Sequence, residues 1–150
     1  MEVTLIVSTR YETGETFLSE QGLRDWVKKW SRTEQICPGL WWVEPGIGGS
    51  EGYPDLTIGR GGRVCFAELK LGKMVVGGAW KVKIRPAQRV ILREMVQAGL
   101  RCIVLVGGLG CGTVVVAEVD GKGSMDVLHQ PMGAAKKPLS LFFKDLLQEP

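Results

Sequence analysis

Two short apolar segments joined by a Gly-Arg-Gly-Gly turn place the strongest constraint on this chain. Residues 53–58 and 64–69 have the length and composition of β-strands, so we predict a hairpin. Charged side chains are normally excluded from such segments, yet Asp55, Glu68 and Lys70 lie within or directly beside them. These charged side chains must therefore either lie at a solvated edge of the sheet or converge on a group that requires negative charge.

The register of the predicted hairpin decides between these two outcomes. If the turn is centred between residues 60 and 61, Asp55 lies opposite Phe66 and points to the same face of the sheet. Side chains alternate along a strand, so Glu68 and Lys70 share that face. Asp55 and Glu68 become diagonal neighbours with backbones about 7–8 Å apart. A slip of one residue would send Asp55 to the opposite face.

Two carboxylates at this spacing predict a cation site. Their mutual repulsion disfavours the doubly ionised state, and a shared divalent cation removes the repulsion. Magnesium suits such a site because it binds few carboxylates and completes its shell with waters and phosphate oxygens. Lys70 would then lie beside the attacking water and offset negative charge in the transition state. The alternative is that Asp55 and Glu68 are unrelated charges at strand ends.

Segments on both sides of the hairpin predict an α/β fold with a mixed sheet flanked by helices. Leu23, Trp26, Val27 and Trp30 have helical spacing behind Ser19, a good N-cap. A second helix is expected from Pro86 to Gly99. Further strands are predicted at 40–43, 101–106, 112–119 and, more weakly, 125–128, with a last helix from Pro138; residues 71–84 show no clear period and read as a basic connection.

The charge of the chain is unevenly distributed. Residues 60–101 hold ten Lys and Arg against Glu68 and Glu94, a balance of +8, whereas the rest of the chain carries −5, for a net charge of +3. A concentrated basic segment suits a polyanion such as nucleic acid, although it can also be a solvated face. The residues we expect to contact DNA are Lys73, Lys81, Lys83, Arg85 and Arg89.

Length and cysteine content narrow the class of protein. A chain of 150 residues is sufficient for one domain with its own core. None of the cysteines at 37, 65, 102 and 111 forms a C-x-x-C pair, and Cys65 and Cys102 lie in apolar runs, so we expect free buried thiols. No apolar run approaches the roughly 20 residues of a membrane span, and the N-terminus does not read as a signal peptide. We expect no membrane partner and a cytoplasmic location.

The motifs around these charges resemble the PD-(D/E)xK nuclease superfamily, most closely its VRR-NUC and Holliday-junction-resolvase-like branches. The resemblance covers residues 18–107 and leaves 108–150 as a C-terminal hairpin and helix extension of a single nuclease domain, 1–150. The matching elements are Glu20 on an early helix, Gly52-Tyr53-Pro54-Asp55-Leu56, Glu68-Leu69-Lys70, and Arg85-Pro86-Ala87-Gln88 opening the next helix. A small apolar strand follows Gly99.

This resemblance implies a restriction-endonuclease-like core and magnesium-dependent phosphodiester hydrolysis, with manganese as a substitute. It implies that Asp55, Glu68 and the Leu69 carbonyl bind the metal and that Lys70 positions the water. Gln88 is expected at the active end of the sheet, against the alternative of a surface amide. Glu20 is expected to orient a second metal or a water, although an acid at a helix N-terminus is also favoured by the helix dipole alone.

We therefore predict a magnesium-dependent DNA endonuclease. Selectivity for junctions or branched DNA is compatible with the resemblance, as is a homodimer that cuts two strands. Many VRR-NUC proteins are phage-encoded, so the resemblance also suggests a phage protein acting in the host cell. The alternatives are a non-specific DNA nuclease and a non-catalytic nucleic-acid-binding module of the same fold.

Overall fold

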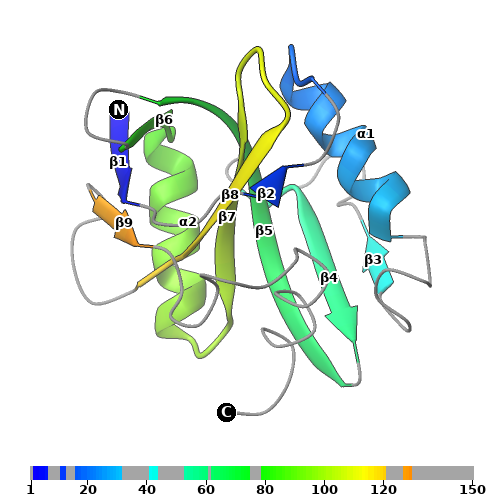
Figure 1. Cartoon of the computed structure of the whole chain (residues 1–150). Coiled ribbons are helices and arrows are strands. Elements are labelled where there is room, and N and C mark those ends of the chain that lie inside the picture. Colours follow the sequence, from blue (N-terminus) through cyan, green and yellow to red (C-terminus); the bar gives the residue numbers. More distant parts are fainter. Residues whose placement is uncertain are drawn as a thin grey trace.

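The computed structural model describes the backbone of residues 2–6, 11–12, 16–31, 41–43, 53–60, 62–74, 79–120 and 127–129. Within these ranges a mixed sheet is flanked by two helices, which confirms the predicted α/β class at this level (Figure 1). The helices are α1 (Glu20–Ser31) and α2 (Pro86–Gln97). The strands are β1 (Glu2–Ile6), β2 (Tyr11–Glu12), β3 (Trp41–Val43), β4 (Leu56–Arg60), β5 (Arg63–Met74), β6 (Trp80–Lys83), β7 (Cys102–Gly108), β8 (Thr113–Glu118) and β9 (Val127–His129).

Both helices begin where local signals predict. At the start of α1 the Ser19 hydroxyl accepts a hydrogen bond from the Gly22 N–H at 3.1 Å, so it satisfies a donor that the helix itself cannot pair. Pro86 is the first residue of α2, where its missing N–H costs nothing. Gly99 follows the end of α2 with φ +89°, a conformation that glycine adopts without strain.

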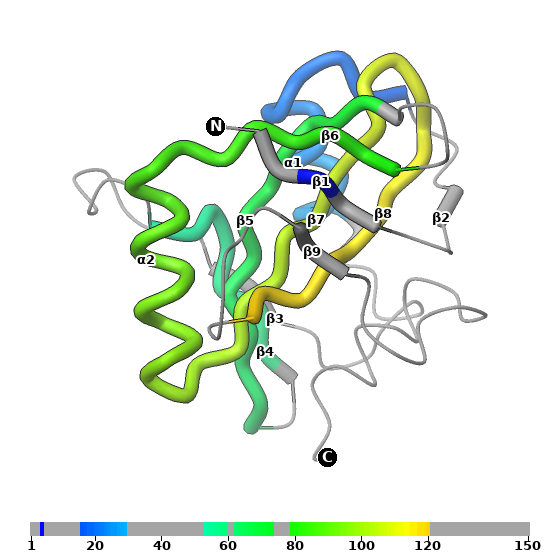
Figure 2. Tube along the Cα trace, turned by 90° about the vertical axis from the view of Figure 1, so that its left-hand side faces the viewer, coloured from blue at the N-terminus to red at the C-terminus, as the bar shows by residue number. Residues whose placement is uncertain are grey.

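The two faces of the sheet carry separate apolar cores. Leu23 and Val27 of α1 pack on one face with Leu69 and its neighbours in β5 and β7. Leu92 of α2 belongs to the core on the opposite face, which includes Val104 of β7. Figures 1 and 2 show α1 and α2 on different sides of the central strands. The strands between them are therefore buried on both faces.

The hairpin exists, but the predicted register is wrong by two residues. Arg60 pairs with Arg63, and Gly62 between them takes φ +80°. Thr57, rather than Asp55, lies opposite Phe66. A shift of two residues preserves the alternation of faces. Continuing the observed register places Asp55 opposite Glu68, closer than the diagonal relation that the predicted register implied.

The prediction of an irregular connection over 71–84 is also wrong where the structure describes it, whereas residues 75–78 lie outside the described residues. β5 continues to Met74, and the chain returns antiparallel as β6 at Trp80–Lys83. Gly72 obscures this pattern in the sequence, but close packing explains it: a Cβ there would lie 2.7 Å from Val106 Cγ1. Lys70, Gly72 and Lys73 together interrupt the apolar alternation by which strands are recognised.

Other expectations have mixed outcomes. The weak strand predicted at 125–128 occurs as β9, whereas β1 and β2 were not predicted.

Cys65 and Cys102 are free and buried, as expected, and burial raises the pKa of each thiol to about 12. Cys37 and the helix predicted from Pro138 lie outside the described residues. Neither described helix is long and apolar enough to cross a membrane.

Candidate active site

The site lies at a fork in the edge of β5. Residues 63–67 of β5 pair with β4, and residues 72–74 pair with β6 on the same edge, while β7 occupies the opposite edge. In the described part of the chain, residues 68–71 therefore face a gap between two strands. Asp55 fills part of that gap, because its Oδ2 accepts a hydrogen bond from the Leu69 N–H at 2.8 Å. A carboxylate here takes the place of a backbone carbonyl in the ladder.

The same geometry directs the Leu69 carbonyl. In an extended strand the N–H and C=O of one residue point to the same side. Since the Leu69 N–H points at Asp55, its carbonyl oxygen also faces the gap. The sequence resemblance implied that this carbonyl binds metal, and no strand pairing of the described residues occupies it on this edge.

The Glu68 carboxyl is buried and accepts a hydrogen bond from a side chain of α2. Its side chain lies on the face of the sheet opposite to Leu69 and is only 1% exposed. The Gln88 Nε2 donates a hydrogen bond to Glu68 Oε1 at 2.7 Å, and the Arg85 N–H donates to Gln88 Oε1 at 3.0 Å. These two bonds fix the orientation of the amide. Gln88 is 4% exposed, so the alternative of a surface amide is wrong.

The pKa of Glu68 is raised from 4.5 to about 9. Burial is the largest cause, followed by the charge of Asp55 and a hydrogen bond between the two carboxyl groups. Lys70 opposes the shift, and Glu20 adds to it. In the metal-free protein Glu68 therefore keeps its proton at neutral pH. The convergence of Asp55 and Glu68 predicted from the sequence is present.

Lys70 lies between two acids from different elements. Its Nζ is 3.8 Å from Glu68 Oε1 and 3.9 Å from Glu20 Oε1, at the start of α1. These separations are within ion-pair range but longer than a hydrogen bond. Lys70 is only 7% exposed, and in the metal-free protein, where Glu68 is protonated, Glu20 provides the opposite charge that a buried ammonium requires. Glu20 thus contacts the lysine, which is more than a helix-dipole role would require.

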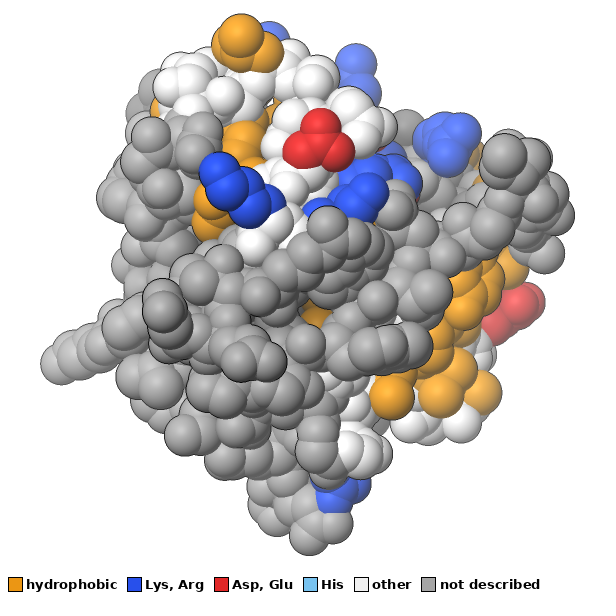
Figure 3. Space-filling view, turned by 90° about the vertical axis from the view of Figure 1, so that its right-hand side faces the viewer, with side chains coloured by type: hydrophobic (Ala, Val, Ile, Leu, Met, Phe, Trp, Pro, Cys, Tyr) orange, Lys and Arg blue, Asp and Glu red, His pale blue; other side chains and the backbone are white. Residues whose placement is uncertain are grey.

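Sequence reasoning missed Arg24. Its Nη2 donates to Asp55 Oδ1 at 2.5 Å, and the two side chains are 27% and 20% exposed. Arg24 follows Glu20 by four residues, so both lie on one face of α1, and this spacing was the available signal. Figure 3, viewed from the side on which α1 lies in Figure 1, shows acidic and basic side chains exposed close together.

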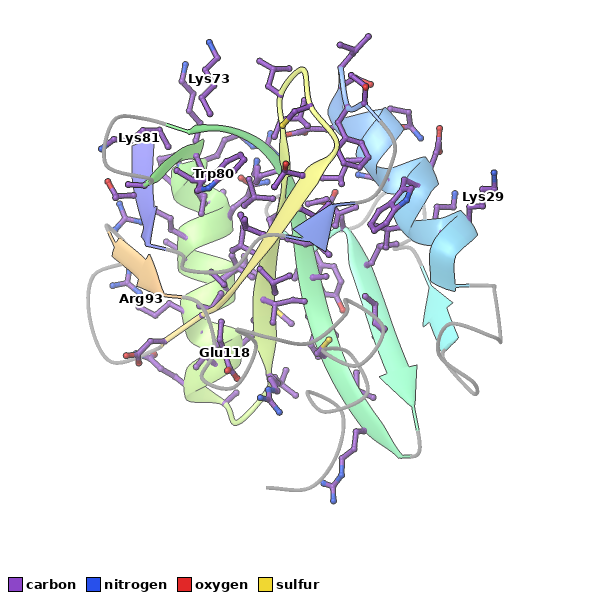
Figure 4. All side chains as sticks on the ribbon, in the orientation of Figure 1. Lys29, Lys73, Trp80, Lys81, Arg93 and Glu118 are labelled. Carbon is purple, nitrogen blue, oxygen red and sulfur yellow. The ribbon has the colours of Figure 1, made fainter. Side chains whose placement is uncertain are left out.

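Three of the predicted DNA-contacting residues gather beside the site. Lys73, Lys81 and Lys83 line a pocket of about 430 Å³, together with Glu20, Leu71, Gly72 and Leu109. Lys73 and Lys81 are direct partners across β5 and β6, and Figure 4 shows them at the same end of the molecule. Lys81 Nζ also donates to Thr4 Oγ1 at 2.8 Å. Because Glu20 contacts Lys70, this basic pocket adjoins the buried charges.

The remaining two predicted DNA contacts lie on or next to α2. Arg85 precedes the helix and is exposed, and Arg89 is half-buried one turn later. They flank Gln88, whose amide reaches Glu68. The described basic residues therefore lie in two groups near the site, one at the start of α2 and one on the β5–β6 pair.

The donor set fits a hard divalent cation. No described group donates a hydrogen bond to Glu68 Oε2, although this oxygen is buried beside Asp55. In the metal-free protein the proton on Glu68 satisfies this carboxyl, and a divalent cation would take the place of that proton when Glu68 ionises. No cluster of three His, Cys, Asp or Glu side chains suited to a metal occurs among the described residues. Magnesium needs fewer protein ligands than that, since it retains waters and takes substrate phosphate oxygens.

Comparison with known proteins leaves the chain without an assigned family. No protein-family model and no curated protein matches it.

Proposed function

We propose that this protein is a magnesium-dependent nuclease that hydrolyses DNA phosphodiester bonds, built on a restriction-endonuclease-like core. One observation carries the proposal: Asp55, Glu68 and Lys70 converge at a gap in the sheet, and Glu68 and Lys70 are buried there. Burial of an acid and a lysine beside a half-buried second acid, at one point of an apolar sheet, costs stability. Such an arrangement is typical of a site selected for chemistry.

Three oxygen donors would hold the metal: the carboxylates of Asp55 and Glu68 and the Leu69 carbonyl. When bound, magnesium supplies Lewis-acid activation of the phosphate and of the attacking water. The hydrogen bond from the Leu69 N–H holds the Asp55 carboxylate in the gap. Gln88 holds Glu68 from the other side, so both acids are oriented before any ligand arrives.

Lys70 is the residue that we expect to contact the reacting groups. Its ammonium donates hydrogen bonds only, so it can orient the attacking water by its lone pair and stabilise charge on the phosphate. Glu20 and Glu68 keep this ammonium near the acids in the free protein. Glu20 therefore acts as a positioning residue in this mechanism.

The basic pocket indicates where the nucleic acid lies. Lys73, Lys81 and Lys83 would contact phosphates next to the scissile bond, because their pocket shares Glu20 with the catalytic group. Internal cleavage of DNA, with selectivity for junctions or branches, is the form of the activity that we favour. A homodimer would supply two such sites for two strands.

The test uses supercoiled plasmid, linear duplex and a four-way junction, each incubated with magnesium, manganese or EDTA. We expect metal-dependent cleavage that Asp55→Asn and Glu68→Gln abolish. Cleavage of the junction with an intact linear duplex would establish structure selectivity, and equal cutting of all three would indicate a non-specific nuclease. Metal-independent binding with no cleavage under either metal would instead identify a non-catalytic binding module.

A further inference from the structure

Asp55 uses both of its carboxylate oxygens in the described structure. Oδ2 accepts from the Leu69 N–H at 2.8 Å, and Oδ1 accepts from Arg24 Nη2 at 2.5 Å. The first bond comes from backbone inside a strand and cannot move without disrupting β5. The second comes from a long side chain that is 27% exposed. Among the groups that bond Asp55, which also include the Glu68 carboxyl, Arg24 is the one that is not a proposed metal ligand and can leave without disturbing β5.

A divalent cation at Asp55 would compete with this guanidinium. Both are positive and both would bind the same small carboxylate, so each weakens the binding of the other. The Leu69 N–H is a neutral donor and raises no such conflict. Metal binding would therefore release Arg24 while leaving Asp55 oriented by the strand.

A released Arg24 has a suitable second partner in the substrate. A guanidinium matches the geometry of a phosphate with two parallel N–H donors. Arg24 lies one helical turn after Glu20, which lines the basic pocket, so a phosphate bound there is on the same face of α1.

We propose that Arg24 is an exchangeable occupant of the metal site, an inference that rests on the proposed nuclease function. In the metal-free protein it neutralises Asp55. When a divalent cation binds, the guanidinium moves from Asp55 to a phosphate of the bound DNA. A purely structural Arg24 would have the opposite effect on the metal, because its loss would free Asp55 to move and weaken metal binding.

The first test is calorimetric titration of MnCl₂ into the protein without DNA. We expect Arg24→Gln to bind manganese more tightly than wild type, by about tenfold, as removal of one adjacent like charge predicts. Arg24→Lys, a milder change, should fall between the two. The matched control is Lys29→Gln, which removes an equal charge from an exposed position on α1 and should leave the affinity unchanged. Asp55→Asn, which removes the shared ligand, should abolish the heat of binding.

The second test measures DNA affinity against salt concentration, with Ca²⁺ or with EDTA. Arg24→Gln should lower the slope of log affinity by about one with Ca²⁺ and leave it unchanged in EDTA, because Arg24 reaches phosphate only when displaced. Unchanged or weaker manganese binding by Arg24→Gln, with normal binding by wild type, would overturn the exchange and leave the nuclease proposal standing. Failure of all variants and wild type to bind manganese would overturn both.

Discussion

Around residues 67–70 both faces of β5 are buried, but they differ in chemistry. Cys65, Ala67 and Leu69 point towards α1, and each is at most 1% exposed. On the other face Glu68 and Lys70 are 1% and 7% exposed. Burial alone therefore does not distinguish structural from functional positions in this strand. The difference lies in whether the buried group needs a partner, and on the second face each charged group has one from another element.

The largest effect is expected from Lys70→Met. Cleavage should fall by about 10²–10⁴-fold, since a positioned donor is lost. Stability should change little, because Glu68 is already protonated in the metal-free protein and no charge is left uncompensated. Single-turnover cleavage and thermal melting of the same preparation measure the two quantities. A strongly destabilised but active Lys70→Met variant would show that Lys70 contributes to stability and not to catalysis.

Leu69→Ala, at the neighbouring residue, is expected to lower stability and to leave cleavage intact. Removing a fully buried leucine should cost about 2–5 kcal/mol of unfolding free energy, through lost burial and the cavity left behind. The backbone N–H and carbonyl at the gap remain, so cleavage at a temperature where the variant is folded should be close to wild type. Urea unfolding with a cleavage assay tests this. Loss of cleavage activity in the folded variant would mean that the side chains on the α1 face of β5 also position the active-site groups.

The pH dependence of stability tests the environment of Glu68. Its pKa is about 9 in the folded protein, against 4.5 as the ordinary value, so between these values the folded state holds a proton that the unfolded state has lost. Stability from this group is therefore fully present below about pH 4.5 and declines as pH rises towards 9. Glu68→Gln mimics the protonated form and should remove this decline. Urea unfolding in EDTA at pH 5, 7 and 9 measures it, and parallel curves for the two proteins would contradict the shift.

A smaller effect is expected from Gln88→Leu. The substitution leaves Glu68 Oε1 without its buried donor and should cost about 1–3 kcal/mol, with the larger loss at high pH where Glu68 is charged. Cleavage should fall less than in Lys70→Met, because Gln88 only orients the acid. Comparing the cleavage rates and unfolding free energies of the two variants separates orientation from direct participation. An effect equal to that of Lys70→Met would place Gln88 in contact with substrate.

Local features were predictable from the sequence. Ser19, Pro86 and Gly99 mark helix ends through interactions within a few residues, and both helices occur where these signals place them. The shared face of Asp55 and Glu68 survived an incorrect register because the side-chain period of a strand is two.

Features that depend on tertiary contact were not predictable in the same way. The register required knowledge of the loop, and Gly72 concealed a strand because its packing partner, Val106, is distant in sequence. Arg24 was missed because its partner Asp55 is 31 residues away and no local pattern links them. The resemblance did place Gln88 at the active end of the sheet, but its burial and its hydrogen bond to Glu68 depend on the packing of α2 against the sheet.

The strand pairing of β5 and the position of α1 lead us to expect different rates of motion for different residues of the site. A strand hydrogen-bonded along both edges exchanges its amide hydrogens slowly, often only when the whole domain opens. Glu68 and Lys70 lie where β5 is paired with β7 on one edge, and the residues before and after them are paired on the other edge as well. Glu20 and Arg24, in contrast, lie near the start of α1, and helix ends fray readily. We therefore expect Glu68 and Lys70 to keep their positions for as long as the domain stays folded. Glu20 and Arg24 can rearrange each time a ligand binds.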